Sequence, residues 1–323
     1  MHWHNETPQW FTVLFKPFSG RGKSIGICQI ASYGTNETHG VQYALLLMLK
    51  QESIPPAAFD PGAVFLPRIQ VELSPEEDLL VRRIVPEKLP RHMAVIMDGN
   101  GRWARSRGFG DRIKGHEAGI ESVRSAVHGS GELGVKALTL YAFSVENWQR
   151  PKAEIHALMG LLDHFLKQEL NDLHRYKVKL VASGRLGDLP ANIRKTLDYT
   201  IAETAANTGL VLNLALSYGG RTEILEAVRT IAEQAARGEL DPARLSEELF
   251  ASYLYHPELG DPDLLIRTSG EMRVSNFLLW QIAYAEIHIT PTLWPDFRRR
   301  ELYTAILDYQ KRERRFGKVL SAK

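Results

Sequence analysis

The feature that most restricts the fold of this chain is a regular alternation of two patterns, which begins at Glu87. Short apolar runs of strand length cover 93–97, 137–143, 179–182, 210–216 and 264–266. Between them, apolar residues recur with a helical period over 116–132, 152–176, 190–207 and 222–237. Parallel strands need crossovers, which usually contain a helix. The sequence therefore predicts an α/β fold, a single domain with a central, mostly parallel sheet flanked by helices on both faces.

Residues 1–86 differ from the rest of the chain in composition and periodicity, because they carry scattered prolines and no long helical pattern. We interpret them either as a poorly ordered N-terminal extension of unknown role or as sequence upstream of the true start, which leaves 87–323 as the regular domain. The string Ser19 to Ser24 ends like a nucleotide phosphate loop, but Pro17 stands where such a loop requires glycine. Nucleotide binding is therefore the weaker interpretation.

The composition excludes several classes of protein. Lys and Arg number 40 and Asp and Glu 38, so a general nucleic-acid binder is not expected and any anion site must be local. Cys28 is the single cysteine, which excludes an internal disulfide and fits a reducing compartment. The chain shows neither an apolar run of membrane-spanning length nor a signal peptide. We expect a cytoplasmic protein.

The first apolar run is followed by a segment whose residues could bind a cation and phosphate groups. After Met97 the chain continues Asp98-Gly99-Asn100-Gly101-Arg102. Ligands of open parallel sheets bind where strands end, and glycine there lets backbone N–H groups approach an anion. Asp98 could hold a divalent cation while Arg102 grips phosphate oxygens. Taken alone, an ordinary glycine-rich turn is an equally good interpretation.

Three further segments favour the functional interpretation. Basic residues lie just before the helical pattern that contains His116: Arg105, Arg107, Arg112 and Lys114. Such residues suit a phosphate bound at the N-terminus of that helix. The loop 141–151 and the loop 266–276 each follow a strand and each combine arginine with serine. Two phosphate-binding regions beside one cation-holding aspartate indicate diphosphate chemistry.

These segments together resemble the cis-prenyltransferases, most closely the bacterial undecaprenyl diphosphate synthases. The resemblance spans 89–317 and rests on these stretches: 92–104, 141–151, 266–281 and 314–317. It implies a homodimer, a hydrophobic tunnel and Mg²⁺. The implied reaction adds isopentenyl diphosphate repeatedly to an allylic diphosphate such as farnesyl diphosphate, each new double bond being cis. It further implies an undecaprenyl product for the cell-wall lipid carrier, with transient contact at the inner face of the membrane when the product leaves.

The resemblance also implies roles for individual residues. Asp98 and Asn147 correspond to catalytic positions, and Asp98 and Glu286 to metal ligands. The allylic diphosphate would be held by Gly99, Asn100, Gly101, Arg102, Arg112 and His116. The isopentenyl diphosphate would be held by Arg267, Arg273 and Ser275, and Val274 is a further substrate-binding position. Further substrate-contacting positions are Trp103, Ser144, Val145, Glu146, Trp148 and Arg150.

Some features leave alternatives open. The loop between Trp103 and His116 is one residue longer than in typical bacterial members, so Arg107 could replace Arg112. No Asp-Asp-x-x-Asp pair is present, which argues against the trans-prenyltransferases. A catalytically silent member of the same fold and a nucleotide phosphotransferase remain competing hypotheses. The product length is not readable, and a medium-length product is the default expectation.

Overall fold

The computed structural model describes residues 9–15, 26–32 and 72–313. The chain divides into two compact units, Met1–Gly62 and Ala63–Lys323. In the first unit, β1 (Gln9–Phe15) and β2 (Gly26–Ser32) form an antiparallel pair in which Gln9 lies opposite Ser32. The loop-like string at 19–24 and the stretch 314–317 lie outside the described residues.

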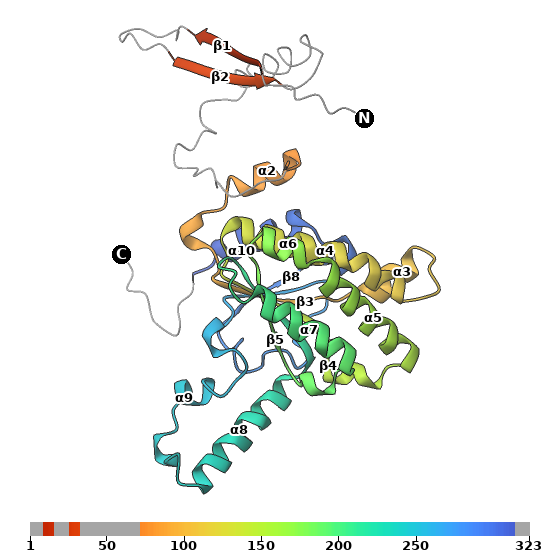
Figure 1. The fold of residues 1–323 in the computed structure, drawn as a ribbon, viewed down its shortest axis with the longest axis vertical. Coiled ribbons are helices and arrows are strands. Elements are labelled where there is room, and N and C mark those ends of the chain that lie inside the picture. Colours follow the sequence, from red (N-terminus) through yellow and green to blue (C-terminus); the bar gives the residue numbers. More distant parts are fainter. Residues whose placement is uncertain (1–8, 16–25, 33–71, 314–323) are drawn as a thin grey trace. The chain divides into compact units, whose positions relative to one another are not determined.

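The second unit is built on a six-stranded sheet of order β5-β6-β4-β3-β7-β8, in which every pair is parallel (Figure 1). Its strands are β3 (His92–Ile96), β4 (Ala137–Ser144), β5 (Lys179–Ser183), β6 (Val211–Tyr218), β7 (Leu264–Arg267) and β8 (Glu286–Ile289). The predicted parallel sheet is confirmed. The edge strand β8 was not predicted, because its sequence Glu286-Ile287-His288-Ile289 lacks the continuous apolar run that marks the other strands.

The α-helices of this unit are α2 (Pro75–Val81), α3 (Asn100–Ser106), α4 (Ile113–Leu133), α5 (Lys152–Gln168), α6 (Leu170–Arg175), α7 (Ala191–Thr204), α8 (Gly220–Ala236), α9 (Glu247–Ala251) and α10 (Arg299–Gln310). The helix predicted over 152–176 is interrupted at Glu169. There, the buried Glu169 carboxylate accepts two hydrogen bonds from Arg124 of α4, at 2.9 and 2.6 Å. Among the described residues, the helices are all too short or too polar to cross a membrane.

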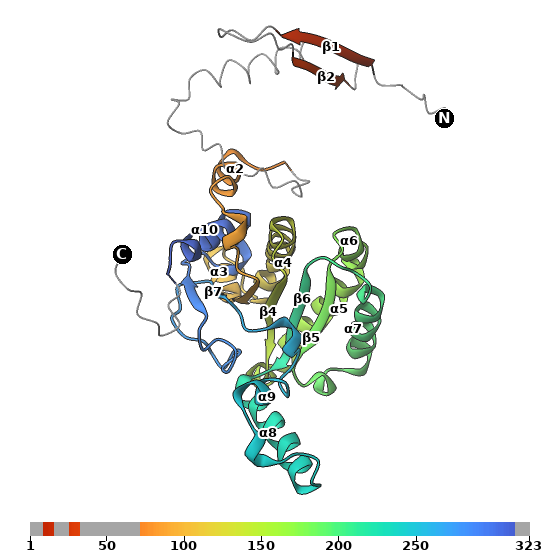
Figure 2. The same cartoon turned by 90° about the vertical axis from the view of Figure 1, so that its left-hand side faces the viewer.

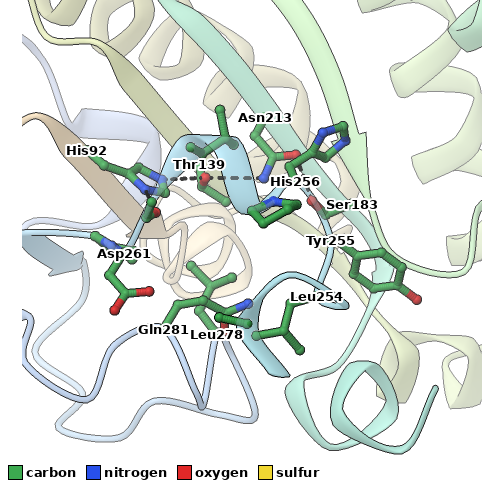
Figure 3. A pocket seen from close by; sticks show the side chains of 15 residues that line it. His92, Thr139, Ser183, Asn213, Leu254, Tyr255, His256, Asp261, Leu278 and Gln281 are labelled. Carbon is green, nitrogen blue, oxygen red and sulfur yellow. Dashed lines mark hydrogen bonds between the residues drawn. The ribbon is translucent and has the colours of Figure 1, made fainter. Parts of the chain in front are cut away.

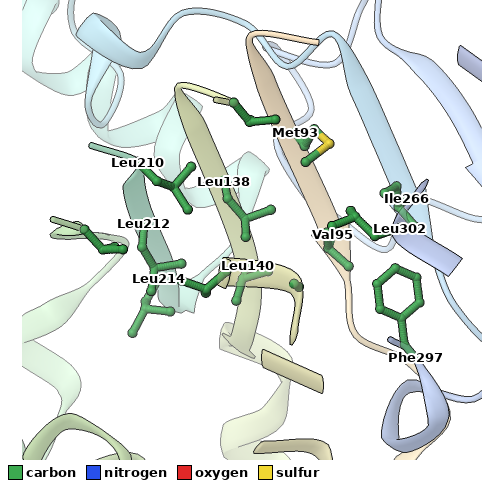
Figure 4. Packing of buried hydrophobic residues seen from close by; sticks show 14 of the residues in the cluster. Met93, Val95, Leu138, Leu140, Leu210, Leu212, Leu214, Ile266, Phe297 and Leu302 are labelled. Carbon is green, nitrogen blue, oxygen red and sulfur yellow. The ribbon is translucent and has the colours of Figure 1, made fainter. Parts of the chain in front are cut away.

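The strands alternate between two faces, as strand geometry requires. Met93 and Val95 of β3 point into the larger core (Figure 4), which also contains residues of helices α4, α5, α7 and α10. Ala94 and Ile96 point into a smaller cluster on the opposite face. That cluster is completed by Phe277 and other residues of the segments around 255 and 274–285, which are not regular helices. The helices therefore do not cover both faces evenly, in contrast to the expectation.

The compact unit begins earlier than composition suggested. Helix α2 starts with a reciprocal capping box between Ser74 and Glu77. It packs against α10, and Val81 and Ile84 belong to the main core. Residues 75–84 are thus part of the unit that carries the sheet, although the expected boundary was at 86.

The strand order places a topological switch point at β3. From β3 the chain goes to β4 on one side, whereas β7 joins β3 from the other side. Figure 2 labels these two neighbours, β4 and β7. Open α/β sheets bind ligands at such a point, outside the carboxyl ends of the strands. The carboxyl ends of β3 and β7 lead directly into Asp98 and Arg267.

A row of buried polar side chains crosses the sheet beneath the segment 254–262 (Figure 3). His92 Nε2 lies 2.8 Å from Thr139 Oγ1, which also accepts from Asn213 Nδ2 at 3.2 Å. Ser183 Oγ donates to Asn213 Oδ1 at 3.0 Å. Burial lowers the pKa of His92. The adjoining cavity measures about 60 Å³, and the row links the four strands β3, β4, β5 and β6.

Candidate active site

The turn after β3 is fixed by the turn after β7. The N–H of Asp98 donates to Thr268 Oγ1 at 2.8 Å, and Thr268 Oγ1 donates back to the Asp98 carbonyl at 2.6 Å. Gly99 has φ 110°, and a Cβ there would lie 3.0 Å from Leu293 and Ser269. Both the conformation and the space therefore require glycine at this position. This turn aims the Asp98 side chain at the end of β7.

Asp98 and Arg267 form the central ion pair. Asp98 Oδ2 lies 2.9 Å from Arg267 Nη2, and the Arg267 side chain is only 4% exposed. Arg267 Nη1 donates to Ser275 Oγ at 2.9 Å and also to the Arg273 carbonyl. Burial alone would raise the pKa of Asp98, but the hydrogen bond and charge of Arg267, with the charge of Arg102, lower it below its usual value. Asp98 is therefore an anion at neutral pH.

Two further arginines and a second carboxylate complete the ion cluster. Arg102 Nη2 lies 3.6 Å from Asp98 Oδ1 and 3.0 Å from Glu271 Oε1. Arg273 lies 3.9 Å from Asp98 Oδ2 and also pairs with Glu271. The cluster thus contains three guanidinium groups and two carboxylates, which leaves one positive charge in excess. This arrangement suits a polyanionic ligand.

Two adjoining cavities lie at this end of the sheet. The polar one, of about 450 Å³, is bordered by Asp98, Arg267 and Ser275. The other, of about 190 Å³, lies between α4, α5 and the sheet and is lined mostly by apolar residues such as Val123, Leu162 and Phe165. Both share these lining residues: Met97, Tyr141, Asn147 and Arg150. The polar cavity, which we call the charged chamber, thus adjoins an apolar cavity.

About half of the predicted site residues line these cavities. Those that line one or both are Asp98, Asn100, His116, Ser144, Glu146, Asn147, Arg150, Arg267 and Ser275. Asn147 Oδ1 accepts the Ser144 N–H at 3.1 Å. Trp148 points away from the charges, and its Nε1 donates to Ser217 Oγ at 2.9 Å. Sequence reasoning thus named residues that lie together in the structure, although it did not identify their partners, and the roles it gave them stay predictions.

Asn100 and His116 join the starts of α3 and α4. Asn100 Nδ2 lies 3.2 Å from His116 Nδ1. Asn100 Oδ1 and His116 Nε2 are buried and have no partner in the structure. Burial, together with the charges of Arg150 and Arg112, lowers the pKa of His116 to about 4. The imidazole is neutral at pH 7, and both unpaired atoms are available to a ligand.

The two candidate loop arginines lie in different places. Arg112 lies beside the start of α3. Its Nε is only 2.7 Å from the position that a Cβ on Gly101 would take. Arg107 Nη2 instead pairs with Asp296 at 3.2 Å and covers the Trp103 ring. Trp103 also binds Asp296, through Nε1 at 2.8 Å, and lines neither cavity. Arg112 is thus the better placed of the two.

The structure does not bring Glu286 to Asp98 within one chain. Glu286 begins β8 and lies in register with Leu264, at the amino end of the sheet. Ile289 is the residue level with Arg267, so Glu286 lies about 10 Å further back along the strand. Its carboxylate pairs with Arg312 at 2.9 Å. Within the described ranges, no three His, Cys, Asp or Glu side chains form a ready-made metal cage.

Some residues of the site were not predicted. Glu271 bridges two arginines, and Glu154 Oε1 lies 2.9 Å from Arg150 and 3.8 Å from Arg112. Asn276 contacts two separate segments, the start of α8 and the turn after β4. Two predicted residues lie at the same corner, since Val145 packs where a Cβ on Gly219 would lie and Val274 joins the smaller apolar cluster. The glycine pair at 219–220 after a strand was a further sequence signal for this corner.

Comparison with known proteins agrees with this geometry. The Prenyltransf family model, described as undecaprenyl diphosphate synthase, matches residues 96–317. An isoprenyl transferase of Heliobacterium mobile is 53% identical over 250 residues, which cover 77% of this chain and 96% of that protein. An isoprenyl transferase of Chlorobaculum tepidum is 55% identical over 231 residues, which cover 72% of this chain and 87% of that protein.

Solved structures show the same fold. Lavandulyl diphosphate synthase from Lavandula x intermedia, crystallised with dimethylallyl diphosphate, is 36% identical with a TM-score of 0.69, and the match covers 72% of this chain and all of that one. A probable undecaprenyl diphosphate synthase from Campylobacter jejuni is 35% identical with a TM-score of 0.60, over 71% of this chain and 99% of that one.

Proposed function

Since the chain belongs to the undecaprenyl diphosphate synthase family and is a prenyltransferase, we propose that it elongates an allylic diphosphate by repeated cis addition of isopentenyl diphosphate. Farnesyl diphosphate is the proposed starter and undecaprenyl diphosphate the proposed product. The observation that carries the proposal is the cluster of three arginines beside an apolar cavity. Charged head groups and a growing hydrocarbon tail need these two surroundings side by side.

We assign the two diphosphates to two parts of the charged chamber. The allylic diphosphate lies at the α3 start, where Arg102, Arg112 and the neutral His116 can donate to it. The isopentenyl diphosphate lies against Arg267, Arg273 and Ser275. In each cycle the allylic C–O bond breaks, diphosphate leaves, and a C–C bond forms to the isopentenyl unit, which then loses a proton. Arginines stabilise the charge that develops on the leaving oxygen.

The proton acceptor follows from the Asn147 contacts. A neutral amide has negligible proton affinity, and Asn147 Oδ1 already accepts the Ser144 N–H. We propose that Asn147 orients the isopentenyl group or a water molecule, while an oxygen of the diphosphate accepts the proton. Asn147 is thus a positioning group in this reaction rather than a base.

The carboxylates of the ion cluster determine where Mg²⁺ would bind. Protein-bound Mg²⁺ is commonly held by one or two carboxylates together with substrate phosphates and water. Asp98 provides an anionic carboxylate at the edge of the chamber, and Glu271 is the next carboxylate in the same ion cluster. We propose Asp98 as the protein ligand. The ion would neutralise the leaving diphosphate.

The apolar cavity gives the elongation its direction. Burial of hydrocarbon gains about 0.8 kcal/mol per CH₂, so each added unit draws the tail inward between α4 and α5. We propose that this cavity is the inner part of a tunnel. The lipid product would leave toward the inner face of the membrane, so the enzyme would act in the cytoplasm with transient membrane contact.

Helix α8 suggests how two copies would associate. Leu225 is 62% exposed and Val228 47% exposed, and both lie on the same side of this helix. Adjacent exposed apolar side chains commonly mark an interface. We propose a homodimer in which α8 contributes to the contact. Sedimentation of the full chain would test this assignment.

One incubation tests the proposed function. Purified full chain is mixed with farnesyl diphosphate, labelled isopentenyl diphosphate and Mg²⁺, and the butanol-extractable product is separated by chromatography. A ladder of polyprenyl products is expected. Binding of both diphosphates without any extractable label would indicate a catalytically silent member. ATP-dependent phosphate transfer would favour the phosphotransferase alternative.

A further inference from the structure

The loop after β7 has an unusual backbone conformation. Ser275, Asn276 and Leu278 have φ values of 48, 61 and 44°. These values lie in the left-handed region, which residues other than glycine rarely adopt. Such strain persists where the surroundings fix it, and it concentrates at functional sites. The contacts of the middle residue show what is being fixed.

Asn276 connects three segments. Its carbonyl accepts the Gly220 N–H at 2.7 Å, and its Oδ1 accepts the Arg221 N–H at 2.9 Å. These two bonds cap α8, whose own N-cap residue, Gly219, has no side chain to do so. Its Nδ2 donates to Glu146 Oε1 at 2.8 Å. Asn276 thus ties the β7 loop to α8 and to the loop after β4.

Gly219 provides the space for this connection. A Cβ on Gly219 would lie 2.7 Å from Asn276 Nδ2 and 2.8 Å from Val145 Cγ2. The φ of Gly219 is −159°, which any residue can adopt. Glycine is therefore needed here to let the Asn276 amide and the loop after β4 approach each other, and not for backbone freedom.

The residues on either side of Asn276 are held as well. Ser275 Oγ accepts from Arg267 at 2.9 Å, and the Ser275 carbonyl accepts from Tyr141 OH at 3.3 Å. Phe277 is fully buried and stacks on Tyr141, with ring centroids 4.3 Å apart. The position of Asn276 is therefore coupled to the buried arginine of the ion cluster.

We propose that Asn276 is a positioning residue that sets the distance between the two halves of the active site. One half is the loop 267–275, which carries Arg267 and Ser275, and the other is the turn 144–149, which carries Asn147. The bond from Asn276 to Glu146 is the direct link between them. This inference rests on the proposed function, because it assigns isopentenyl diphosphate to the first half.

Asn276→Asp separates this role from helix capping. Aspartate keeps an oxygen that accepts the Arg221 N–H, so α8 stays capped. It loses the donor to Glu146 and places two carboxylates together. We expect the KM for isopentenyl diphosphate to rise about tenfold, which corresponds to a typical coupling energy between contacting residues, and kcat to fall. The KM for farnesyl diphosphate and the thermal unfolding midpoint should stay near wild type.

The double variant Glu146→Gln/Asn276→Asp restores the bond with its direction reversed, since glutamine can donate to aspartate. We expect it to recover most of the KM lost in Asn276→Asp. Unchanged kinetics in Asn276→Asp, or no recovery in the double variant, would overturn the inference. Wild-type protein that makes no polyprenyl product in the same assay would instead refute the proposed function.

Discussion

The carboxylate of Asp98 and the guanidinium of Arg267 meet at 2.9 Å across the ends of two neighbouring parallel strands. Asp98 follows β3 and Arg267 ends β7, and the two strands flank the switch point of the sheet. In this state the arginine that should grip a diphosphate is already paired with a carboxylate of its own chain. We therefore expect both residues to be sensitive to substitution.

Asp98→Asn should abolish most turnover while preserving the fold. We expect the initial rate to fall by about 10²-fold or more, the scale seen when one group that stabilises developing charge is removed. Without Mg²⁺, pyrophosphate should bind at least as tightly as to wild type, because a competing carboxylate is gone. Titration with pyrophosphate with and without Mg²⁺ checks this, and a wild-type rate would contradict the role of Asp98.

Leu162→Trp should shorten the product. Leu162 lines the apolar cavity between α4 and α5, and the larger indole would occupy space that the tail needs. The exposed Leu79 of α2 offers a matched control, since Leu79→Trp adds the same bulk away from the cavity. Chromatography of the dephosphorylated products should show a shift to fewer isoprene units in the first variant alone.

His116 should make the free protein less stable at mildly acidic pH. Its pKa is about 4 in the folded protein against 6.5 for the unperturbed group. Between these values the unfolded state binds more protons, so the free energy of unfolding decreases as the pH falls from about 6.5 toward 4. The largest loss from this group is roughly 3 kcal/mol.

Denaturant unfolding at pH 7.5 and pH 5 checks this dependence. His116→Gln should flatten it, while His92 and His128, whose pKa values burial also lowers, contribute equally to both proteins. Identical slopes with pH for wild type and His116→Gln would show that the imidazole is not buried as described.

Two truncations distinguish the two boundaries. Removal of residues 1–62 should leave activity within about twofold of wild type, because the sheet unit starts at Ala63. Removal of residues 1–86 also deletes α2, Val81 and Ile84 from the core. Loss of such buried aliphatic contacts costs about 2–5 kcal/mol, so the unfolding midpoint of the shorter protein should fall clearly. Equal midpoints would restore the boundary at 86.

The parts of the site that follow from local sequence were predictable. The apolar run before Asp98 and the one before Arg267 both read as strands, and parallel strands bring their carboxyl ends to one edge. The interruption at Glu169 was not predicted, because the helical period of apolar residues continues across it. The placement of Glu286 was missed for a related reason, since the short strand that it begins was not recognised.

The contacts of Glu271 and Asn276 were only partly predictable from the sequence. Both residues belong to a segment that was singled out, yet their partners, Arg102 and Glu146, are far away in the sequence. Such pairings appear only once the order of the strands is known. Residue chemistry therefore indicated a candidate site, and the order of the strands decides which of its residues contact one another.

The central position of β3 has a consequence for synthesis of the chain. It is the first strand of this sheet to be made, but its two neighbours are β4 and the much later β7. A nascent chain that has not yet delivered β7 exposes an open, apolar strand edge, which is prone to pair with other chains. Chains truncated before Leu264 should therefore aggregate or require a chaperone, rather than simply lack activity.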